Sequence, residues 1–196
     1  TRDELNQFLE VAKDYGLVAY TYFKLLSATG LRKSEALALT WSDINLTAGT
    51  LSVNKTLAYG LNGKTIIQPP KSPKSKRILP ISDGLKEVLI DYKRKQKIIS
   101  KELFHTNKGT YLRISKPDQW LKSIYAKDHE EKAEYAKKYN LKKPQPDLRH
   151  ITVHGFRHTF ATLLIAETNV KPKTVQMLLG HENIQMTLDI YTHINK

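Results

Sequence analysis

The spacing of apolar residues changes twice along this 196-residue chain, and this change constrains the fold more than any other feature. Near the start, Leu5, Phe8, Leu9 and Ala12 repeat with the period of one helix face. Residues 51–57 alternate apolar and polar side chains, as a half-buried strand does. From residue 82 onwards the helical spacing returns. The order predicts an α+β fold, mainly helical, with a small three-stranded antiparallel sheet in the middle of the chain.

Capping and turn residues set the boundaries of the expected elements. Thr1 and Glu4 fit a helix capping box, Gly30 fits a helix C-terminal cap, and Asn62-Gly63 is a hairpin turn signal. We expect helices over residues 1–14, 17–28 and 31–39, from Ser82, from Pro117, and over 155–166, 172–179 and 184–194. We expect strands over residues 51–57, 65–67 and 77–81.

Residues 126–147 are highly charged and predict a polar helix followed by a loose connection. A domain boundary in this segment is an alternative. However, the residues that follow would form a poor core alone, so we expect one domain over residues 1–196.

The chain is strongly basic, with 32 Lys and Arg against 19 Asp and Glu and a formal net charge of +13. This balance favours a polyanionic partner, which leaves DNA, RNA and an anionic membrane surface open. The absence of cysteine excludes disulfides, thiol catalysis and Cys-ligated zinc. No apolar run approaches the roughly 18 residues of a membrane span and no signal peptide opens the chain, so we expect a cytosolic protein. Because the first residue is Thr1 rather than methionine, we expect a fragment of something longer.

Two segments place arginine and histidine at the starts of predicted helices. Arg32 follows Gly30, and there its guanidinium and the free backbone amides would both face an anion, although a surface arginine is the alternative. His154 and Arg157 lie three residues apart on one helix face and form a donor pair suited to a phosphate. His154 with His158 would alternatively form a zinc pair, but no third ligand is evident.

A third segment lies near the end of the chain. His181 follows Gly180, the expected cap of a helix, and Tyr191 lies ten residues later on the next helix. Taken by itself, a tyrosine at helical spacing is a core or surface aromatic, and the chain has ten tyrosines.

Together and in this order, the segments resemble the motifs of the tyrosine recombinase (phage integrase) family. The matching residues are 29–35 (Thr-Gly-Leu-Arg-Lys-Ser-Glu), a lysine in a β-hairpin, 154–157 (His-Gly-Phe-Arg), 179–181 (Leu-Gly-His) and Tyr191. In the family frame the hairpin lysine is Lys71, with Lys74 as runner-up, and Ser72 replaces the usual threonine. The resemblance covers essentially the whole chain. Residues 154–161 look especially like integrases of phages and conjugative transposons from Gram-positive bacteria.

The resemblance implies DNA strand exchange that requires neither ATP, metal nor any other cofactor. Tyr191 would attack the scissile phosphate, form a 3′-phosphotyrosine and release a 5′-hydroxyl. Lys71 would supply the proton that the leaving oxygen needs. For Glu35 we expect a structural ion pair.

Four further residues would stabilise the transition state in this resemblance. Arg32 and Arg157 would offer forked donors to the non-bridging phosphate oxygens. His181 would donate to the same oxygens. His154 would donate there too, or would help to deprotonate Tyr191.

Other basic residues are expected to bind phosphates without reading sequence. The main candidates are Lys74, Lys76, Arg77, Lys93 and Arg94, and the further candidates are Lys55, Lys64, Lys142 and Lys143.

The resemblance also implies partners. These are double-stranded DNA at attachment sites and, for the full-length protein, a homo-tetramer on two such sites, with no membrane involved. Members of the resembled family usually carry an N-terminal core-binding domain, and some add a domain before it that binds DNA arm sites. We expect neither domain in this chain. We therefore expect the fragment alone to be monomeric, in the bacterial cytosol and close to the nucleoid. A type IB topoisomerase-like enzyme and a non-catalytic DNA-binding protein are the alternative functions.

Overall fold

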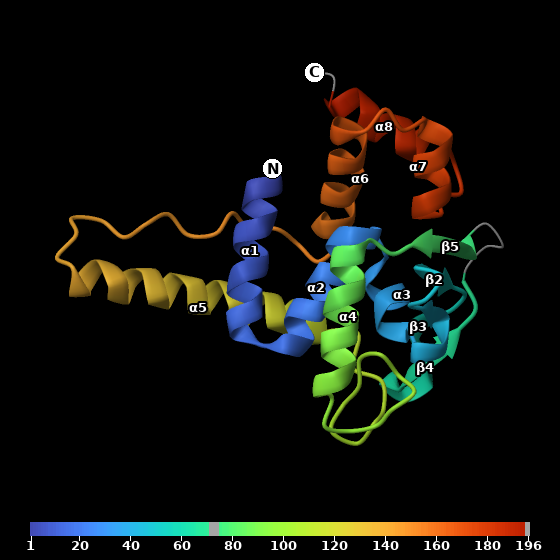
Figure 1. Ribbon diagram of the computed structural model, residues 1–196, viewed down its shortest axis with the longest axis horizontal. Coiled ribbons are helices and arrows are strands. Elements are labelled where there is room, and N and C mark those ends of the chain that lie inside the picture. The colour runs from blue at the N-terminus through green and yellow to red at the C-terminus, as the bar shows by residue number, and fades with distance from the viewer. Residues whose placement is uncertain (71–74, 195–196) are drawn as a thin grey trace.

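The chain folds into a mainly helical body with two small sheets at one side of it, beside α3 and α4 (Figure 1). The computed structural model describes residues 1–70 and 75–194. Its helices are α1 (Arg2–Tyr15), α2 (Leu17–Thr29), α3 (Lys33–Ala38), α4 (Asp83–Lys95), α5 (Lys116–Lys138), α6 (Gly155–Glu167), α7 (Pro172–Leu179) and α8 (Gln185–Ile194). Each expected helix is present close to its expected boundaries, which confirms the mainly helical α+β class.

The main hydrophobic core lies where α1, α2, α4 and α5 meet. The predicted capping box fixes the start of α1, since the Thr1 hydroxyl accepts from the Glu4 amide at 3.2 Å. The rings of Phe8, Phe23 and Phe156 contact one another with centroids 5.0 to 5.2 Å apart. Because Phe156 belongs to the first turn of α6, this aromatic cluster holds the start of α6 against α2.

The strands form two sheets rather than the single three-stranded sheet that the sequence predicts. One sheet has the order β1 (Ile44–Asn45), β2 (Thr50–Val53) and β5 (Arg77–Pro80). The other is a hairpin of β3 (Thr56–Tyr59) and β4 (Thr65–Gln68). All pairs are antiparallel, and the predicted Asn62-Gly63 turn lies within the hairpin connection. The expected strand over residues 51–57 is therefore divided between β2 and β3.

A buried carboxylate explains this division. Asp43 accepts hydrogen bonds from Asn54, at 3.1 Å, and from the Lys55 ammonium, and it also accepts from the Thr40 hydroxyl at 2.7 Å. Asn54 and Lys55 thus turn toward Asp43 instead of continuing the ladder. The bend aims the β3–β4 hairpin at α3, which it contacts.

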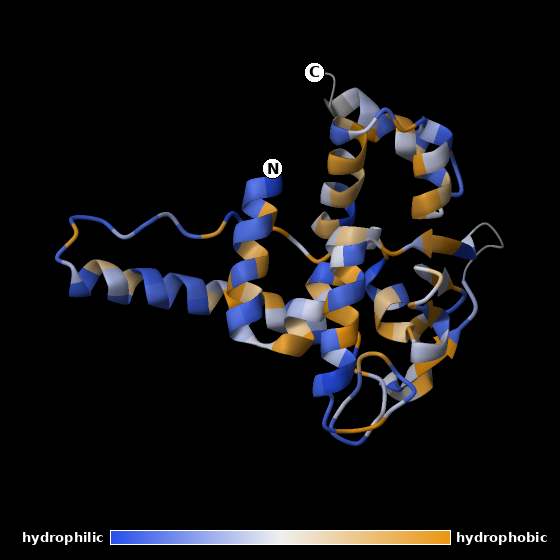
Figure 2. Cartoon of the chain, viewed as in Figure 1, coloured by the Kyte–Doolittle hydropathy of each residue, from blue (hydrophilic) through white to orange (hydrophobic). Residues whose placement is uncertain are grey.

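Helix α5 extends far beyond the body of the molecule (Figure 1). Its apolar residues Trp120, Leu121 and Ile124 lie in the first half and pack into the main core. The distal half is hydrophilic (Figure 2). Residues 139–153, all of which the structure describes, return to the body without helix or strand. The predicted polar helix and its connection are confirmed.

A second, smaller apolar cluster joins α6, α7 and α8. Ala161, Val175 and Leu179 are buried at its centre, and Phe160 and Ile190 pack against them. These three helices stand together above the core in Figure 1. Within the described residues, no helix combines the length and the apolar character that a membrane crossing requires.

Candidate active site

Arg32 lies in the tight turn between α2 and α3. α2 ends at Gly30, whose φ of 63° is left-handed, and a Cβ at Gly30 would lie 2.4 Å from the Phe160 ring. Arg32 then precedes α3 as its N-cap residue. Its guanidinium donates to Glu35 at 2.9 Å and to the Gly180 carbonyl at 3.2 Å, yet 37% of the side chain remains exposed. Arg32 is thus fixed by protein on one side and open on the other.

Three arginines converge on the C-terminal end of α7. Arg77 Nε donates to the carbonyl of residue 178 at 2.7 Å, Arg157 Nη2 to that of residue 179 at 2.6 Å, and Arg32 Nη2 to that of residue 180 at 3.2 Å. The last carbonyls of a helix have no partner within the helix, and they form the negative end of its dipole. Gly180, with φ 64°, turns the chain here. The end of α7 therefore aligns guanidinium groups from three different parts of the chain.

Arg157 is buried, unlike Arg32. Only 4% of the residue is exposed, and Nη1 donates to the Gly30 carbonyl at 2.8 Å. Its two carbonyl partners are Gly30, which caps α2, and Leu179, the last residue of α7. Arg157 therefore links the turn that holds Arg32 to the segment that carries His181.

Glu35 is the carboxylate at the back of the site. Arg77 donates to both of its oxygens, at 3.1 and 2.8 Å, and the Arg32 amide donates to it at 2.9 Å. The predicted structural ion pair of Glu35 is therefore present. The phosphate contact expected of Arg77 stays a prediction, and in this structure its donors are engaged by Glu35, by residue 178 and by the Ser75 carbonyl. Since β5 enters the protein at Arg77, this guanidinium faces inward.

The histidines occupy the start of α6 and the turn after α7. His154 is the N-cap residue of α6, and His158 lies one turn later with its ring centroid 4.8 Å away. Both are exposed. His181 is buried, and its Nδ1 lies 2.9 Å from the Thr187 hydroxyl. A Thr187 hydroxyl that donates to Nδ1 would leave the proton of neutral His181 on Nε2.

These side chains enclose a small cavity of about 100 Å³. Its lining consists of Arg32, His154, Arg157, His158, Leu179, His181, Met186 and Ile190. The structure thus brings together four of the six predicted catalytic residues. Five cationic or imidazole side chains meet around a space that no carboxylate of the described residues lines, which is the composition of an oxyanion site.

Burial and the neighbouring positive charges both shift the ionisation of these groups. Burial and then the charges of Arg157 and Arg32 lower the pKa of His181 to about 4. Burial and then His158 lower the pKa of His154 as well. Burial alone would raise the pKa of Glu35, but the hydrogen bonds and charges of Arg77 and Arg32 outweigh it and lower this pKa. Bound negative charge would relieve the repulsion, so the cavity is electrostatically prepared for an anion.

A larger pocket of about 700 Å³ opens from Arg32 between α3 and the β3–β4 hairpin. Gln68, Pro69, Pro70 and Ser75 are among the residues that line it. Lys71 and Lys74 themselves lie outside the described residues.

The other predicted phosphate contacts are spread over the molecule. Lys76 is exposed just before β5. Lys93 and Arg94 are exposed in the last turn of α4, where Lys93 Nζ lies 5.1 Å from the ring centroid of Trp41. The lining of the two pockets includes none of these three among the described residues.

Tyr191 is turned away from the cavity. Its hydroxyl donates to the Val170 carbonyl at 2.5 Å, in the connection between α6 and α7. The preceding residue, Ile190, lines the cavity instead, together with Met186 one turn earlier. Successive residues of an α-helix differ by about 100° around its axis. A rotation or shift of α8 of that order would therefore exchange Ile190 for Tyr191.

Sequence reasoning missed three features of the site. It assigned His158 only to an alternative zinc pair, and no cluster of three metal-binding side chains occurs in the described part of the chain. The helical spacing of His154 and His158 was the signal for a shared site. Nothing in the spacing indicated the contact of Thr187 with His181 or the inward direction of Arg77.

The sequence matches the model of the phage integrase family over residues 1–196. It is 29% identical to the ICEBs1 integrase of Bacillus subtilis (strain 168) over 193 residues, which cover 98% of this chain and 49% of that protein. It is 30% identical to the transposase from transposon Tn916 of Enterococcus faecalis over 199 residues, which cover 97% of this chain and 46% of that protein. The chain thus spans about half the length of these relatives.

Solved structures share the fold. The Tn1549 transposon integrase in complex with transposon right end DNA superposes with a TM-score of 0.69 at 24% identity, covering 97% of this chain and 60% of that one. The XerA recombinase gives 0.68 at 23% identity, covering 100% and 60%.

Proposed function

The chain belongs to the phage integrase family, and we propose that residues 1–196 are the catalytic domain of a site-specific recombinase. The domain cuts and rejoins DNA of a phage or mobile element through a 3′-phosphotyrosine. One observation carries the proposal: Arg32, Arg157 and His181, from three separate segments, meet His154 around a cavity suited to a single phosphate group.

The two arginines stabilise the transition state. Attack on a phosphodiester gives a pentavalent centre with extra negative charge on its non-bridging oxygens. Arg32 is partly open and Arg157 is held rigidly by two backbone carbonyls, so both donor sets are oriented before the reaction begins. Such preorganised donors are worth about 3–4 kcal/mol each.

The histidines and one lysine handle protons and further hydrogen bonds. His181 is neutral at pH 7 and donates to a phosphate oxygen through Nε2. His154 donates to the phosphate or accepts the proton of Tyr191. Lys71 protonates the 5′-oxygen as the bond between phosphorus and that oxygen breaks.

Tyr191 is the nucleophile in this proposal. Its oxygen forms the new bond to phosphorus, and the bond energy kept in the phosphotyrosine later drives rejoining without ATP. In the DNA-free arrangement its hydroxyl is held by Val170, so cleavage requires α8 to move.

The partner is double-stranded DNA at attachment sites, and the full-length protein acts as a homo-tetramer on two such sites in the bacterial cytoplasm. The net charge of +13 and the DNA bound in the Tn1549 integrase structure support the DNA partner. This chain alone is monomeric in the proposal.

Covalent trapping tests the function directly. The chain is incubated with radiolabelled nicked DNA that spans the ends of its parent element, and the products are separated on a denaturing gel. A shifted band that Tyr191→Phe abolishes is the expected result. Tyr59→Phe, at an exposed tyrosine of β3, is the matched control and retains the band. A band that persists in Tyr191→Phe overturns the assignment of the nucleophile, and DNA binding without any band overturns the catalytic function of this chain.

A further inference from the structure

The far end of α5 and the turn after it form a projection that the catalytic site does not use (Figure 1). We call residues 126–143 the arm and residues 135–143 its tip. Charge is divided sharply along the arm. Its four acidic residues lie between positions 128 and 134, whereas the tip has four lysines and no acidic residue. The four tip lysines are Lys137, Lys138, Lys142 and Lys143.

The tip is folded rather than frayed. The Tyr139 amide donates to the Tyr135 carbonyl at 3.1 Å, and the Leu141 amide donates back to the Ala136 carbonyl at 2.9 Å. Asn140 between them has a φ of 51°, the left-handed conformation that ends helices. The rings of Tyr135 and Tyr139 lie 4.6 Å apart.

The return segment is tied to the helix at the root of the arm. The carboxylate of Asp128 accepts from the Leu148 amide and from Lys132, both at 2.9 Å. Lys132 also donates to the Pro146 carbonyl at 2.7 Å. These bonds hold the two sides of the arm together, so the tip keeps a defined position.

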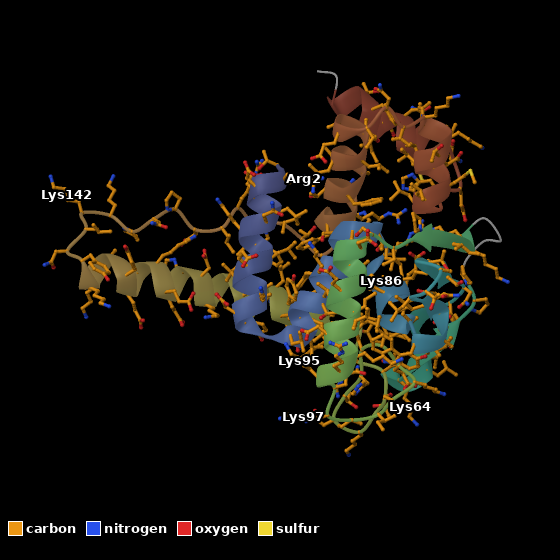
Figure 3. The ribbon with its side chains drawn as sticks, in the orientation of Figure 1. Arg2, Lys64, Lys86, Lys95, Lys97 and Lys142 are labelled. Carbon is orange, nitrogen blue, oxygen red and sulfur yellow. The ribbon has the colours of Figure 1, made fainter. Side chains whose placement is uncertain are left out.

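The tip lysines differ from those at the root. At the root, Lys127 pairs with Glu131 and Lys132 pairs with Asp128. Within the described part of the chain, none of the four tip lysines has a carboxylate partner. Figure 3 shows Lys142 at the extreme end of the projection, pointing into solvent. Tyr135 and Tyr139 are 51% and 54% exposed beside these charges.

We propose that the arm tip binds the phosphate backbone of duplex DNA, at a position separate from the scissile phosphate. Lysine ammonium groups on flexible stems neutralise phosphates without reading bases, and tyrosine hydroxyls also bind phosphate oxygens. For the tip itself, a second copy of the chain is the less suitable partner, because a protein of net charge +13 offers four lysines fewer anionic groups than a duplex does.

The length of α5 limits how far from the active site this contact can fall. The first turn of α5 is joined to the active site by an ion pair of 2.9 Å between Asp118 and Lys33, the residue after Arg32. The twenty residues from Asp118 to Lys138 span roughly 30 Å of helix. At 3.4 Å per base pair, that length corresponds to roughly nine base pairs of duplex. The identification of DNA as the ligand of the arm tip rests on the proposed function.

Salt-dependent binding tests the proposal. The quadruple variant Lys137→Gln, Lys138→Gln, Lys142→Gln, Lys143→Gln is compared with the unaltered chain on a duplex of thirty base pairs centred on the element end. The matched control changes four exposed lysines outside the arm to glutamine, at Lys13, Lys97, Lys101 and Lys108. Each phosphate contact contributes about 0.9 to the slope of log K against log salt. We expect the tip variant to lose about two to four units of slope and at least tenfold in affinity at 0.1 M salt, and the control to lose less than one unit.

The outcomes separate the arm from the catalytic function, because covalent trapping is run on the same preparations. Equal slopes in the tip variant and the control overturn the arm contact, whether or not trapping succeeds. A tip-dependent slope in a chain that traps no DNA supports the arm while the catalytic function fails. If a single copy of the tip variant binds the duplex normally and only the cooperative binding of a second copy is lost, the tip is a protein interface and the DNA contact is wrong.

Discussion

Arg77 and Glu35 form a buried two-point ion pair directly behind Arg32. The guanidinium of Arg77 donates to both carboxylate oxygens, and the side chains are only 6% and 4% exposed. Glu35 in turn accepts from the amide and the guanidinium of Arg32. Arg77 is thus turned toward the protein, and it sets the position of Arg32, whose side chain is 37% exposed. It also donates to the end of α7, two residues before the turn at Gly180.

The first prediction concerns this pair. Arg77→Gln leaves the Glu35 carboxylate buried without its main partner, and removing one member of a buried ion pair costs about 3–5 kcal/mol. We expect urea unfolding to show a loss of that size and the rate of covalent trapping to fall at least a hundredfold, because Arg32 loses its fixed support. Arg77→Lys keeps the charge but not the fork and should recover only part of the rate.

A double variant distinguishes positioning from stability. Arg77→Gln with Glu35→Gln removes the stranded charge, so stability should return in part while the trapping rate stays low. Equal recovery of stability and rate would show that Arg77 supports the fold alone.

The second prediction concerns the turn that positions Arg32. Gly30→Ala places a Cβ within 2.4 Å of Phe160 and 2.9 Å of Leu179, at a φ that alanine rarely adopts. Overpacking of this kind costs about 1–3 kcal/mol, and the left-handed conformation adds about 1 kcal/mol more. We expect a thermal midpoint several degrees lower. Gly63 also has a positive φ, but an added Cβ there meets nothing within 4 Å. Gly63→Ala should therefore lose only the roughly 1 kcal/mol of the left-handed conformation. Identical losses in the two variants would contradict the packing argument.

The third prediction follows from His181. Its pKa is about 4 in the folded chain and about 6.5 when unfolded, so the unfolded chain binds more protons between these values. The contribution of His181 to stability is therefore complete above pH 6.5 and is lost as the pH falls toward 4. The loss is at most about 3.5 kcal/mol, at roughly 1.4 kcal/mol per pKa unit.

Urea unfolding at pH 7.5 and pH 5 measures this loss. His181→Gln removes the titrating ring, so the variant should lose less stability than the unaltered chain over the same interval. Sulfate should reduce the loss in the unaltered chain, because a bound anion favours the protonated ring. The same pH dependence in both proteins would contradict the assignment.

The sequence predicted the helices and the hairpin turn from local signals, and it predicted four of the residues around the cavity from the family resemblance. Capping residues and helical spacing are local, and so are the two glycine turns that precede Arg32 and His181. What it did not predict depends on contacts between distant segments. The division of the strand at Asn54 requires Asp43 to be buried beside it, and the inward turn of Arg77 requires the end of α7, a hundred residues away. The withdrawal of Tyr191 likewise depends on Val170, in a connection without regular structure.

The last prediction concerns that withdrawal. The Tyr191 hydroxyl donates to Val170 at 2.5 Å, and burial raises its pKa above the ordinary value of 10. Both effects favour the phenol over the phenolate, so the DNA-free chain keeps the proposed nucleophile protonated. With 3-fluorotyrosine at position 191, ¹⁹F NMR should show a titration above that of free 3-fluorotyrosine amide. Addition of the element-end duplex should shift the resonance and lower the titration midpoint, because α8 must release Val170 to bring the oxygen beside Arg32 and Arg157. A resonance that titrates like the free amide, or one that DNA leaves unchanged, would mean that the contact with Val170 does not control the nucleophile.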